Sequence, residues 1–221
     1  MATSVSQAKP IVFVVDDDIS VRESLELLVR CEGWDAETYA SAQEFLARSR
    51  PRVPSCLVLD VSLPGLNGLD LQKRLAVERT DMPIMFITGY GDVPTSVRAM
   101  KAGAVEFLTK PFQPSVLVGA IRESLDRSRL ALAREMELCT LWSRYASLTR
   151  RERQVMALVV SGLLNKQVGG ELGISEITVK AHRGQVMQKM QAQSLPDLVR
   201  ISARLSPERA LDSPVQLKNC A

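Results

Sequence analysis

Five side chains that could bind metal or phosphate follow short apolar runs in the first half of the chain. They are Asp16, Asp17, Asp60, Thr88 and Lys110. Hard oxygen ligands suit Mg²⁺, which takes one or two protein carboxylates and leaves room for phosphate oxygens. A carboxylate beside such a metal can attack phosphorus and form an aspartyl phosphate. The residue types therefore indicate phosphoryl transfer to an aspartate.

The arrangement of these residues along the chain suggests a separate role for each. Asp60 stands alone after its apolar run, whereas Asp16 and Asp17 are adjacent. We therefore predict that Asp60 accepts the phosphate and that the pair holds the metal. Lys110 offers a positive charge to the phosphoryl oxygens, and Thr88 offers a hydrogen-bond donor. One aspartate at a strand end is commonly a cap or turn residue, so the joint pattern carries the prediction.

A sheet of parallel strands would bring these residues together. Short runs rich in β-branched residues, which favour strands, alternate with stretches of helical period; the runs are 11–15, 36–39, 56–59, 84–88 and 105–109. This alternation predicts an α/β fold with a five-stranded, doubly wound parallel sheet. In such a sheet, functional groups gather just beyond the carboxyl ends of the strands.

Capping signals mark where the helices between these strands should begin and end. Ser20 with Glu23, and Ser41 with Glu44, have the spacing of a capping box. Gly33 follows the first expected helix, where a left-handed residue would end it. Further helices are expected after Gly68, from Pro94 and from Pro114, the last continuing through 128–146 as a helical linker.

The net charge of +3 is unevenly distributed over the 221 residues. Residues 1–128 carry 14 basic and 17 acidic side chains, whereas residues 129–221 carry 14 and 8. The basic half is therefore the candidate for binding nucleic acid. One histidine and no C-x-x-C pair argue against a zinc site. No apolar run approaches the roughly 18 residues of a membrane helix and the start resembles no signal peptide, so we expect a cytoplasmic protein without a membrane partner.

The basic half has the pattern of a helix-turn-helix. Thr149 with Glu152 forms a capping box that opens a helix. A short helix over 166–172 ends at Gly173, and Ser175 is placed to cap the next one. Two helices joined by a short glycine-containing turn in a basic segment are typical of DNA-binding domains.

The third of these helices is expected to enter the major groove of DNA. Its predicted exposed face carries Lys180, Arg183 and Gly184, and base reading is expected from Lys180, Ala181 and Arg183. Contacts to phosphates are expected from Lys166, Thr178, Arg183 and Lys189.

Residues 10–127 resemble the receiver domain of two-component response regulators. The matching features are the Asp16-Asp17 pair, Asp60 within 59–65, Thr88 before Gly89, and Lys110-Pro111. This resemblance implies that Asp60 accepts phosphate from the phosphohistidine of a partner sensor kinase. It also implies Mg²⁺ held by Asp17, Asp60, the backbone carbonyl of Ser62 and, through water, Asp16. The bond between Lys110 and Pro111 would be cis.

Switching in that family couples the phosphorylated aspartate to a threonine and an aromatic residue. The positions here are Thr88 and Phe107. The added negative charge would draw the hydroxyl inward and admit the ring to the vacated space. Phe107 could equally be an ordinary core residue.

Residues 147–206 resemble the four-helix LuxR-type DNA-binding domain. The resemblance rests on 148–155, Gly162, 165–166, 172–175, 178–180, 182–183 and 189–190. Together the two domains have the FixJ/NarL architecture, closer to the FixJ branch. The resemblance implies a regulator rather than an enzyme, which dimerises on phosphorylation, binds double-stranded promoter DNA and works with RNA polymerase. Gly169, Gly170 and Gly184 depart from the family pattern by placing glycine inside helices, where it costs stability.

The expected organisation has five parts: a tail (1–9), the receiver domain (10–127), the linker (128–146), a small all-α four-helix DNA-binding domain (147–206) and a second tail (207–221). An alternative is a phosphohydrolase of the haloacid dehalogenase type, which also uses an aspartate after a strand. That type needs D-x-D-x-T/V, whereas Asp16 and Asp18 are followed by Ser20. It would also leave the helix-turn-helix unexplained.

Overall fold

The computed structural model of the chain describes residues 9–79, 81–89 and 91–205. The expected tails lie outside these residues, except for Lys9. The chain divides into two compact units, and the division falls between Arg134 and Glu135. Within the described ranges, no helix combines the length and the apolar character needed to cross a membrane.

The first unit is built on a parallel sheet in the order β2-β1-β3-β4-β5. Its strands are β1 (Ile11–Val15), β2 (Asp35–Tyr39), β3 (Ser55–Asp60), β4 (Ile84–Thr88) and β5 (Glu106–Thr109). Every neighbouring pair of strands is parallel. The expected five-stranded doubly wound sheet is therefore confirmed, with strand ends within one residue of the predicted runs.

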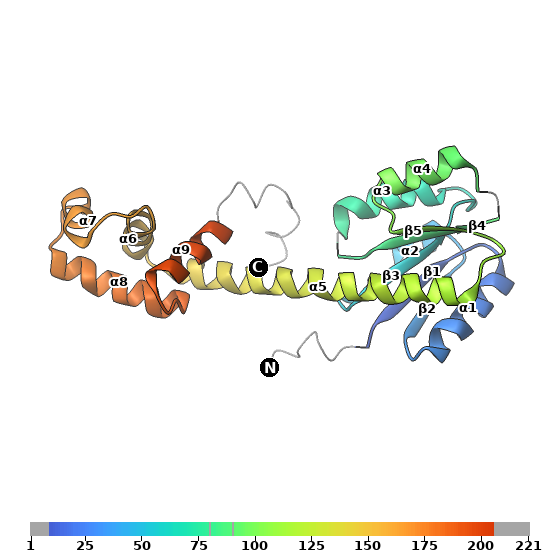
Figure 1. Cartoon of the computed structure of the whole chain (residues 1–221), viewed down its shortest axis with the longest axis horizontal. Coiled ribbons are helices and arrows are strands. Elements are labelled where there is room, and N and C mark those ends of the chain that lie inside the picture. Colours follow the sequence, from blue (N-terminus) through green and yellow to red (C-terminus); the bar gives the residue numbers. More distant parts are fainter. Residues whose placement is uncertain (1–8, 80, 90, 206–221) are drawn as a thin grey trace. The chain divides into compact units, whose positions relative to one another are not determined.

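Helices cover both faces of the sheet (Figure 1). They are α1 (Ile19–Cys31), α2 (Ala42–Ala47), α3 (Gly68–Glu78), α4 (Val93–Lys101) and the start of α5 (Pro114–Ala146). Side chains alternate between the faces along each strand, so Phe13 packs against α2 while Val12 packs against α1 and α5. Two apolar layers result, and they bury the central strands β1, β3 and β4 almost completely, whereas the edge strands β2 and β5 are partly exposed.

The helix ends confirm most of the capping signals and correct one. Ser41 caps α2 and accepts a hydrogen bond from the Glu44 amide, and Gly33 follows α1 with φ of 84°. The expected capping box of Ser20 is wrong, because α1 begins earlier. Asp18 is the cap, and its carboxylate accepts hydrogen bonds from the Ser20 amide and hydroxyl.

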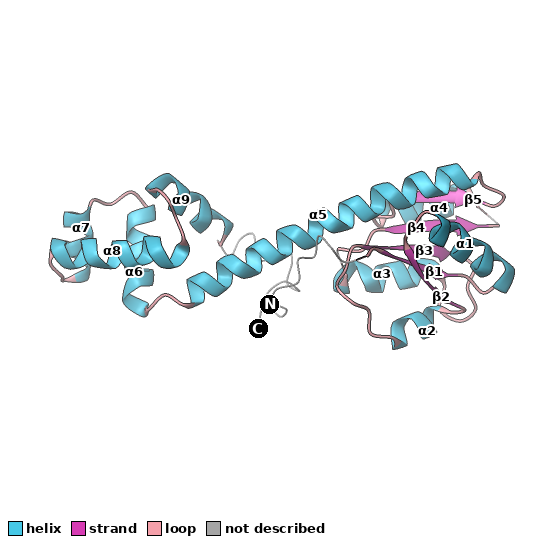
Figure 2. Cartoon of the chain, turned by 90° about the horizontal axis from the view of Figure 1, so that it is seen from below, coloured by secondary structure: helices cyan, strands magenta, loops and turns pink. Residues whose placement is uncertain are grey.

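The described residues of the second unit form helices joined by short loops, as Figure 2 shows. It contains α6 (Arg150–Val160), α7 (Asn165–Leu172), α8 (Glu176–Met190) and α9 (Leu195–Arg204). Apolar residues of these helices and of the end of α5 form two contiguous clusters. The expected four-helix domain is confirmed, and the linker of 128–146 is the second part of α5.

The turn between α7 and α8 is the tight turn of a helix-turn-helix. Gly173 ends α7 with φ of 64°, and the Ser175 side chain accepts a hydrogen bond from the Thr178 amide at 3.2 Å. A Cβ atom on Gly169 would lie 2.7 Å from the carbonyl oxygen of Ile174. Glycine at 169 therefore allows α7 to pack closely against the turn, whereas a Cβ on Gly170 would meet no atom within 4 Å.

Candidate functional site

The carboxyl ends of four neighbouring strands bring the predicted reactive residues together. Strand pairing sets Asp60 beside Ile87, and Thr88 beside Thr109. Asp16 follows β1, and Lys110 follows β5. Asp16, Asp60 and Thr88 are almost fully buried. As the strand-end rule predicts, these four side chains therefore lie at one edge of the sheet.

Lys110 joins two of these carboxylates. Its ammonium lies 2.6 Å from Oδ2 of Asp16 and 3.3 Å from Oδ1 of Asp60. Burial tends to lower the pKa of Lys110, but the hydrogen bond and charge of Asp16, together with Asp60, outweigh it and leave this pKa raised. The lysine therefore stays charged. Its ammonium is the cation that the two buried carboxylates share.

The Asp60 side chain is held at both of its oxygens. Oδ2 accepts a hydrogen bond from the Ser62 amide at 2.7 Å, while Oδ1 faces Lys110. Burial raises the pKa of Asp60, and the positive charge of Lys110 opposes that rise. This carboxylate is fixed in position and poorly hydrated, as suits a nucleophile that must be aligned before it reacts.

Glycine 68 lets α3 begin directly against the end of β3. A Cβ atom at this position would lie 2.3 Å from the carbonyl oxygen of Asp60 and 3.1 Å from the Phe86 ring. The Gly68 amide also donates a hydrogen bond to the carbonyl of Val61. This close approach defines where the chain leaves Asp60, and it was not predicted from the sequence.

Thr88 and Phe107, the expected switch pair, lie on neighbouring strands. Thr88 is fully buried, and its carbonyl accepts a hydrogen bond from the Lys110 amide at 2.7 Å. Phe107 is half-buried, with its ring centroid 6.1 Å from that of Phe86. A Cβ atom on Gly91 would lie 3.2 Å from the Phe107 ring and 3.5 Å from Cγ2 of Thr88. The nearest atom to that Cβ would be Cγ2 of Thr109 at 2.5 Å, so glycine at 91 lets the loop after β4 pack closely against these side chains.

Arg22 is a residue of this site that sequence reasoning missed. Its guanidinium donates hydrogen bonds to the carbonyl oxygens of Asp16 and Asp17, at 2.7 and 2.9 Å. It thus holds the acidic turn after β1 from the first turn of α1. A basic residue six positions after a strand-end aspartate was the available signal, but it is a weak one.

The acidic residues offer a partial cation site. Asp16 and Asp60 are buried and share one ammonium, whereas Asp17 is exposed. Across the part of the chain that the structure describes, no three carboxylate, histidine or cysteine side chains come close enough to form a metal cluster. Two carboxylates meet the need of Mg²⁺, which takes one or two and completes its shell with water or carbonyl oxygens.

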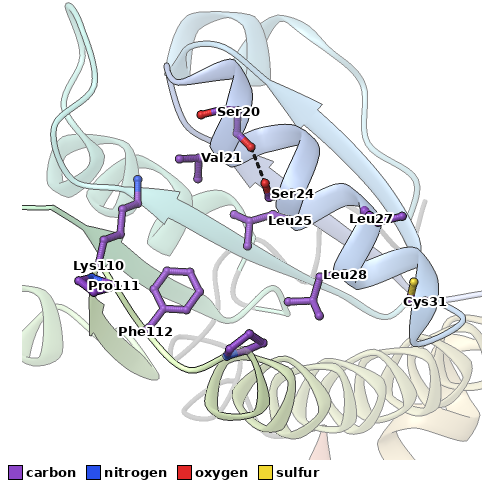
Figure 3. Close-up of a pocket in the computed structure, with 11 residues that line it drawn as sticks. Ser20, Val21, Ser24, Leu25, Leu27, Leu28, Cys31, Lys110, Pro111 and Phe112 are labelled. Atoms are coloured by element: carbon purple, nitrogen blue, oxygen red, sulfur yellow. Dashed lines mark hydrogen bonds between the residues drawn. The ribbon is translucent and has the colours of Figure 1, made fainter.

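An apolar pocket of about 610 Å³ opens beside Lys110 (Figure 3). It lies between α1 and the segment that follows β5. Leu25, Leu28 and Phe112 line it, and Cys31 stands at its far end. The bond between Lys110 and Pro111 is cis, as the resemblance implied. The pocket therefore presents apolar surface next to Lys110.

In the second unit, α8 exposes most of the predicted base-reading residues. Lys180, Ala181 and Gly184 are exposed, as are Lys166 on α7 and Thr178 on α8. Lys180 pairs with Glu176 at 3.2 Å on the helix surface. Exposed pairs of this kind contribute little to stability and are readily exchanged for other partners.

Two basic residues of this unit lie differently from the prediction. Arg183 is half-buried rather than on the exposed face, and it contacts Oδ1 of Asn165 at 3.3 Å. The reason is its spacing, four residues after buried Val179 and three before buried Val186. The ammonium of Lys189 lies 2.7 Å from Oε2 of Glu152, so it is paired within the unit.

Comparisons with known proteins match both units to characterised families. Residues 12–122 match the response regulator receiver domain, and residues 146–202 match the luxR family of bacterial regulatory proteins. Nodulation protein W of Bradyrhizobium diazoefficiens is 51% identical over 200 residues, covering 90% of this chain and 88% of that protein. Transcriptional regulatory protein FixJ of Azorhizobium caulinodans is 44% identical over 191 residues, covering 86% and 90%. The solved structure of response regulator StyR is 49% identical with a TM-score of 0.79, covering 89% of this chain and 100% of that one.

Proposed function

Because the chain belongs to the two-component response regulators with a receiver domain and a LuxR-type DNA-binding domain, we propose that phosphorylation of Asp60 controls promoter binding by the second unit. One observation carries the proposal. The ammonium of Lys110 bridges buried Asp16 and Asp60 at the carboxyl edge of the sheet. A strand-end carboxylate held next to a fixed positive charge is suited to receiving a phosphoryl group.

In the proposed step, a carboxylate oxygen of Asp60 attacks the phosphorus of a phosphohistidine on the partner sensor kinase. A P–O bond forms, the P–N bond breaks, and the electron pair of that bond returns to the imidazole nitrogen. Lys110 neutralises charge on the phosphoryl oxygens and Thr88 donates a hydrogen bond to them. Positioning and electrostatics supply most of the catalysis in reactions of this kind.

Magnesium is the proposed cofactor of this step. The proposed ligands are Asp16, Asp17, Asp60 and the backbone carbonyl of Ser62. Two of these carboxylates, Asp16 and Asp60, already share the positive charge of Lys110, which supports their assignment as cation ligands. The ion would neutralise the negative charge of phosphoryl oxygens brought next to two carboxylates.

The apolar pocket beside Lys110 is the proposed docking place of the kinase. A kinase that delivers phosphate to Asp60 must approach the carboxyl edge of the sheet. Exposed Leu27 on α1 adjoins the pocket and extends its apolar surface outward. The fit of an apolar partner helix there would bring the phosphohistidine close to the acceptor.

The signal is proposed to pass through Thr88 and Phe107. The phosphoryl group draws the Thr88 hydroxyl inward, and the Phe107 ring moves into the space left, which changes the surface of the receiver domain. The altered surface favours a homodimer, which then binds its promoter and activates transcription with RNA polymerase.

On DNA, α8 is the proposed recognition helix. Lys166 and Thr178 contact phosphates, while Lys180, Ala181 and Gly184 face the bases, in keeping with their exposure. We assign Arg183 and Lys189 to holding the domain together, because their side chains already contact Asn165 and Glu152.

Labelling with a small phosphate donor tests the acceptor assignment. The full chain incubated with acetyl phosphate and Mg²⁺ should gain one phosphate by mass spectrometry, and Asp60→Asn should gain none. Asp17→Asn should label more slowly at low Mg²⁺, because it removes a proposed ligand. Equal labelling of Asp60→Asn and wild type would remove Asp60 from its role.

A second experiment tests the link to DNA. Phosphorylated protein should shift toward the dimer in sedimentation and bind promoter fragments more tightly than unphosphorylated protein. If phosphorylation changes neither the oligomeric state nor the DNA affinity, the coupling fails even where Asp60 is labelled.

A further inference from the structure

The proposed recognition helix exposes an apolar strip, and the functions above do not say which chemical groups on DNA it contacts. Ile177 is 79% exposed, the most exposed large apolar side chain among the described residues. Ala181 and Gly184 follow it at intervals of four and three, which places all three on one face of α8. We call Ile177, Ala181 and Gly184 the α8 strip.

The core of the second unit does not account for the α8 strip. Val179, Val186 and Met190 supply the packing face of this helix, and they lie on its other side. A single exposed isoleucine is ordinary on a protein surface. The position of this one is informative, because the first turns of a recognition helix are the part that contacts base edges.

Gly184 gives a second, independent indication. Glycine inside a helix is less stable than alanine, so it is expected where packing demands it. Packing demands it at Gly169, where a Cβ atom would strike the Ile174 carbonyl, but a Cβ atom on Gly184 would meet nothing within 4 Å. Gly119 and Gly170 are helix glycines with open space as well, so what distinguishes Gly184 is its place on the exposed face of α8 with Ile177 and Ala181, where glycine would let an outside surface come close to the helix.

The chemistry of the α8 strip limits what it can recognise. Its side chains have no hydrogen-bond donor or acceptor, so they read apolar groups and shape. In the major groove, the apolar group on a base edge is the C5-methyl of thymine. Lys180, one turn from Ile177, adds a positive charge beside the strip, and this charge suits negatively charged DNA.

We propose that the α8 strip reads thymine methyl groups, with Ile177 making the contact and Gly184 letting the helix backbone approach the groove. This inference rests on the proposed function, in which α8 enters the major groove. It assigns sequence discrimination to residues without hydrogen-bonding side chains and leaves Lys180 as their charged neighbour.

Replacing thymine by uracil tests the contact directly, because uracil lacks only the methyl group. A preferred duplex is first selected from a random-sequence pool with the phosphorylated full chain. Each thymine of that duplex is then replaced singly by deoxyuridine. At one position in each half-site, this replacement should weaken binding by the wild-type protein about fourfold, which is the loss expected for one buried methyl group. Ile177→Ala should bind both duplexes equally.

Gly184→Ala tests the close approach. This variant should melt at a higher temperature than wild type yet bind the selected duplex at least tenfold more weakly. Gly170→Ala, a helix glycine that also has open space and lies off the strip, should melt higher and keep its DNA affinity.

The outcomes separate the inference from the function beneath it. If no duplex is enriched, or if Asp60 accepts no phosphate, the proposed function fails and the inference falls with it. If a duplex is enriched but Ile177→Ala keeps the full penalty for uracil, the α8 strip does not read methyl groups and the proposed function stands. Unchanged DNA affinity in Gly184→Ala would remove glycine 184 from the inference.

Discussion

At the scale of single residues, Lys110 balances the charges of Asp16 and Asp60. Its ammonium is shared by two carboxylates that are almost fully buried. Removing one partner from a buried ionic group leaves uncompensated charge, which is costlier than losing the whole group. The lysine therefore contributes to the stability of the receiver domain.

Lys110→Ala should lower the free energy of unfolding of the receiver domain by about 1–3 kcal/mol, because Asp16 and Asp60 lose their cation. Hydrogen exchange of β1 and β3 amides in the full chain measures this loss. Lys101→Ala, at an exposed site on α4, is the matched control and should stay within about 0.5 kcal/mol of wild type. Equal stabilities of the two variants would contradict the role of the bridge.

Gly68→Ala should displace the end of β3, because the added Cβ would lie 2.3 Å from the Asp60 carbonyl oxygen. We expect slower labelling of Asp60 by acetyl phosphate and a less stable receiver domain. Gly119→Ala is the control: it lies in α5 with no atom within 4 Å of its Cβ, and it should gain about 0.5–1 kcal/mol. Normal labelling of Gly68→Ala would show that the strand end can shift freely.

The sequence predicted the residues whose chemistry is tied to a strand end. Asp60, Thr88 and Lys110 could be found because parallel strands bring their carboxyl ends together. Gly68 and Arg22 could not, because a close approach and a hydrogen bond to a carbonyl depend on tertiary distances. Arg183 was misplaced although its spacing from Val179 and Val186 already indicated the packed side of the helix.

At the scale of elements, one ion pair ties the start of α6 to the end of α8. Thr149 and Glu152 form the predicted capping box, and the buried Glu152 carboxylate also accepts two hydrogen bonds from Lys189, at 2.7 and 2.9 Å. The hydrogen bond from Lys189, and then the Thr149 amide, hold the pKa of Glu152 below its usual value of 4.5. A local capping motif thus also fixes the packing of two helices.

This shift gives the DNA-binding domain a stability that depends on pH. Glu152 has a lower pKa folded than unfolded, so its contribution is fully present above about pH 4.5 and is lost as the pH falls through the folded value. Glu152→Gln should lower stability at pH 7 by about 1–2 kcal/mol. The difference from wild type should shrink toward pH 3.

Melting of the full chain across this pH range, followed by exchange of α6 amides, measures the effect. Glu171→Gln, at an exposed site on α7 of the same domain, is the control and should follow wild type at every pH. A constant difference between Glu152→Gln and wild type from pH 7 to pH 3 would exclude the ion pair as its source.

The element boundaries show where local signals decide. The Ser41, Thr149 and Ser175 caps were predicted because each side chain binds an amide three residues away. At α1 the cap differs from the expected one. Asp18 rather than Ser20 became the cap, with its carboxylate binding both the amide and the hydroxyl of Ser20.

At the scale of the whole molecule, the acidic excess and the basic excess lie in different halves of the chain. The first 128 residues carry an excess of three acidic groups, and the remainder an excess of six basic groups. Acidic groups suit a site that binds a cation, and basic groups suit a surface that binds the phosphates of DNA. The small net charge of the chain hides this division.

DNA binding should therefore fall steeply with salt, whereas labelling by acetyl phosphate should change little. Lys166→Ala should weaken binding of all duplexes alike and reduce the slope of log affinity against log salt by about 1, because it removes one phosphate contact. Lys73→Ala, on α3 of the receiver domain, should leave the slope unchanged. A slope unaffected by Lys166→Ala would show that this lysine does not meet a phosphate.

Two domains and their order could be predicted from the sequence, but the linker could not be separated from its neighbours. Residues 128–146 have helical periodicity with no glycine or proline, and they continue α5 from Pro114 without a break. The division between the compact units falls after Arg134, inside this helix. Contacts in three dimensions define that point, and no local feature of the sequence marks it.

The burial of Asp60 also bears on the lifetime of a phosphoryl group bonded to it. An acyl phosphate is hydrolysed when water attacks phosphorus from the side opposite the aspartate oxygen. Access for water therefore governs its lifetime. Asp60 is only 5% exposed, so the surrounding protein limits the directions from which water can reach a phosphoryl group bonded to it. Under the proposed function, the depth of this carboxylate below the surface contributes to the lifetime of the phosphorylated state.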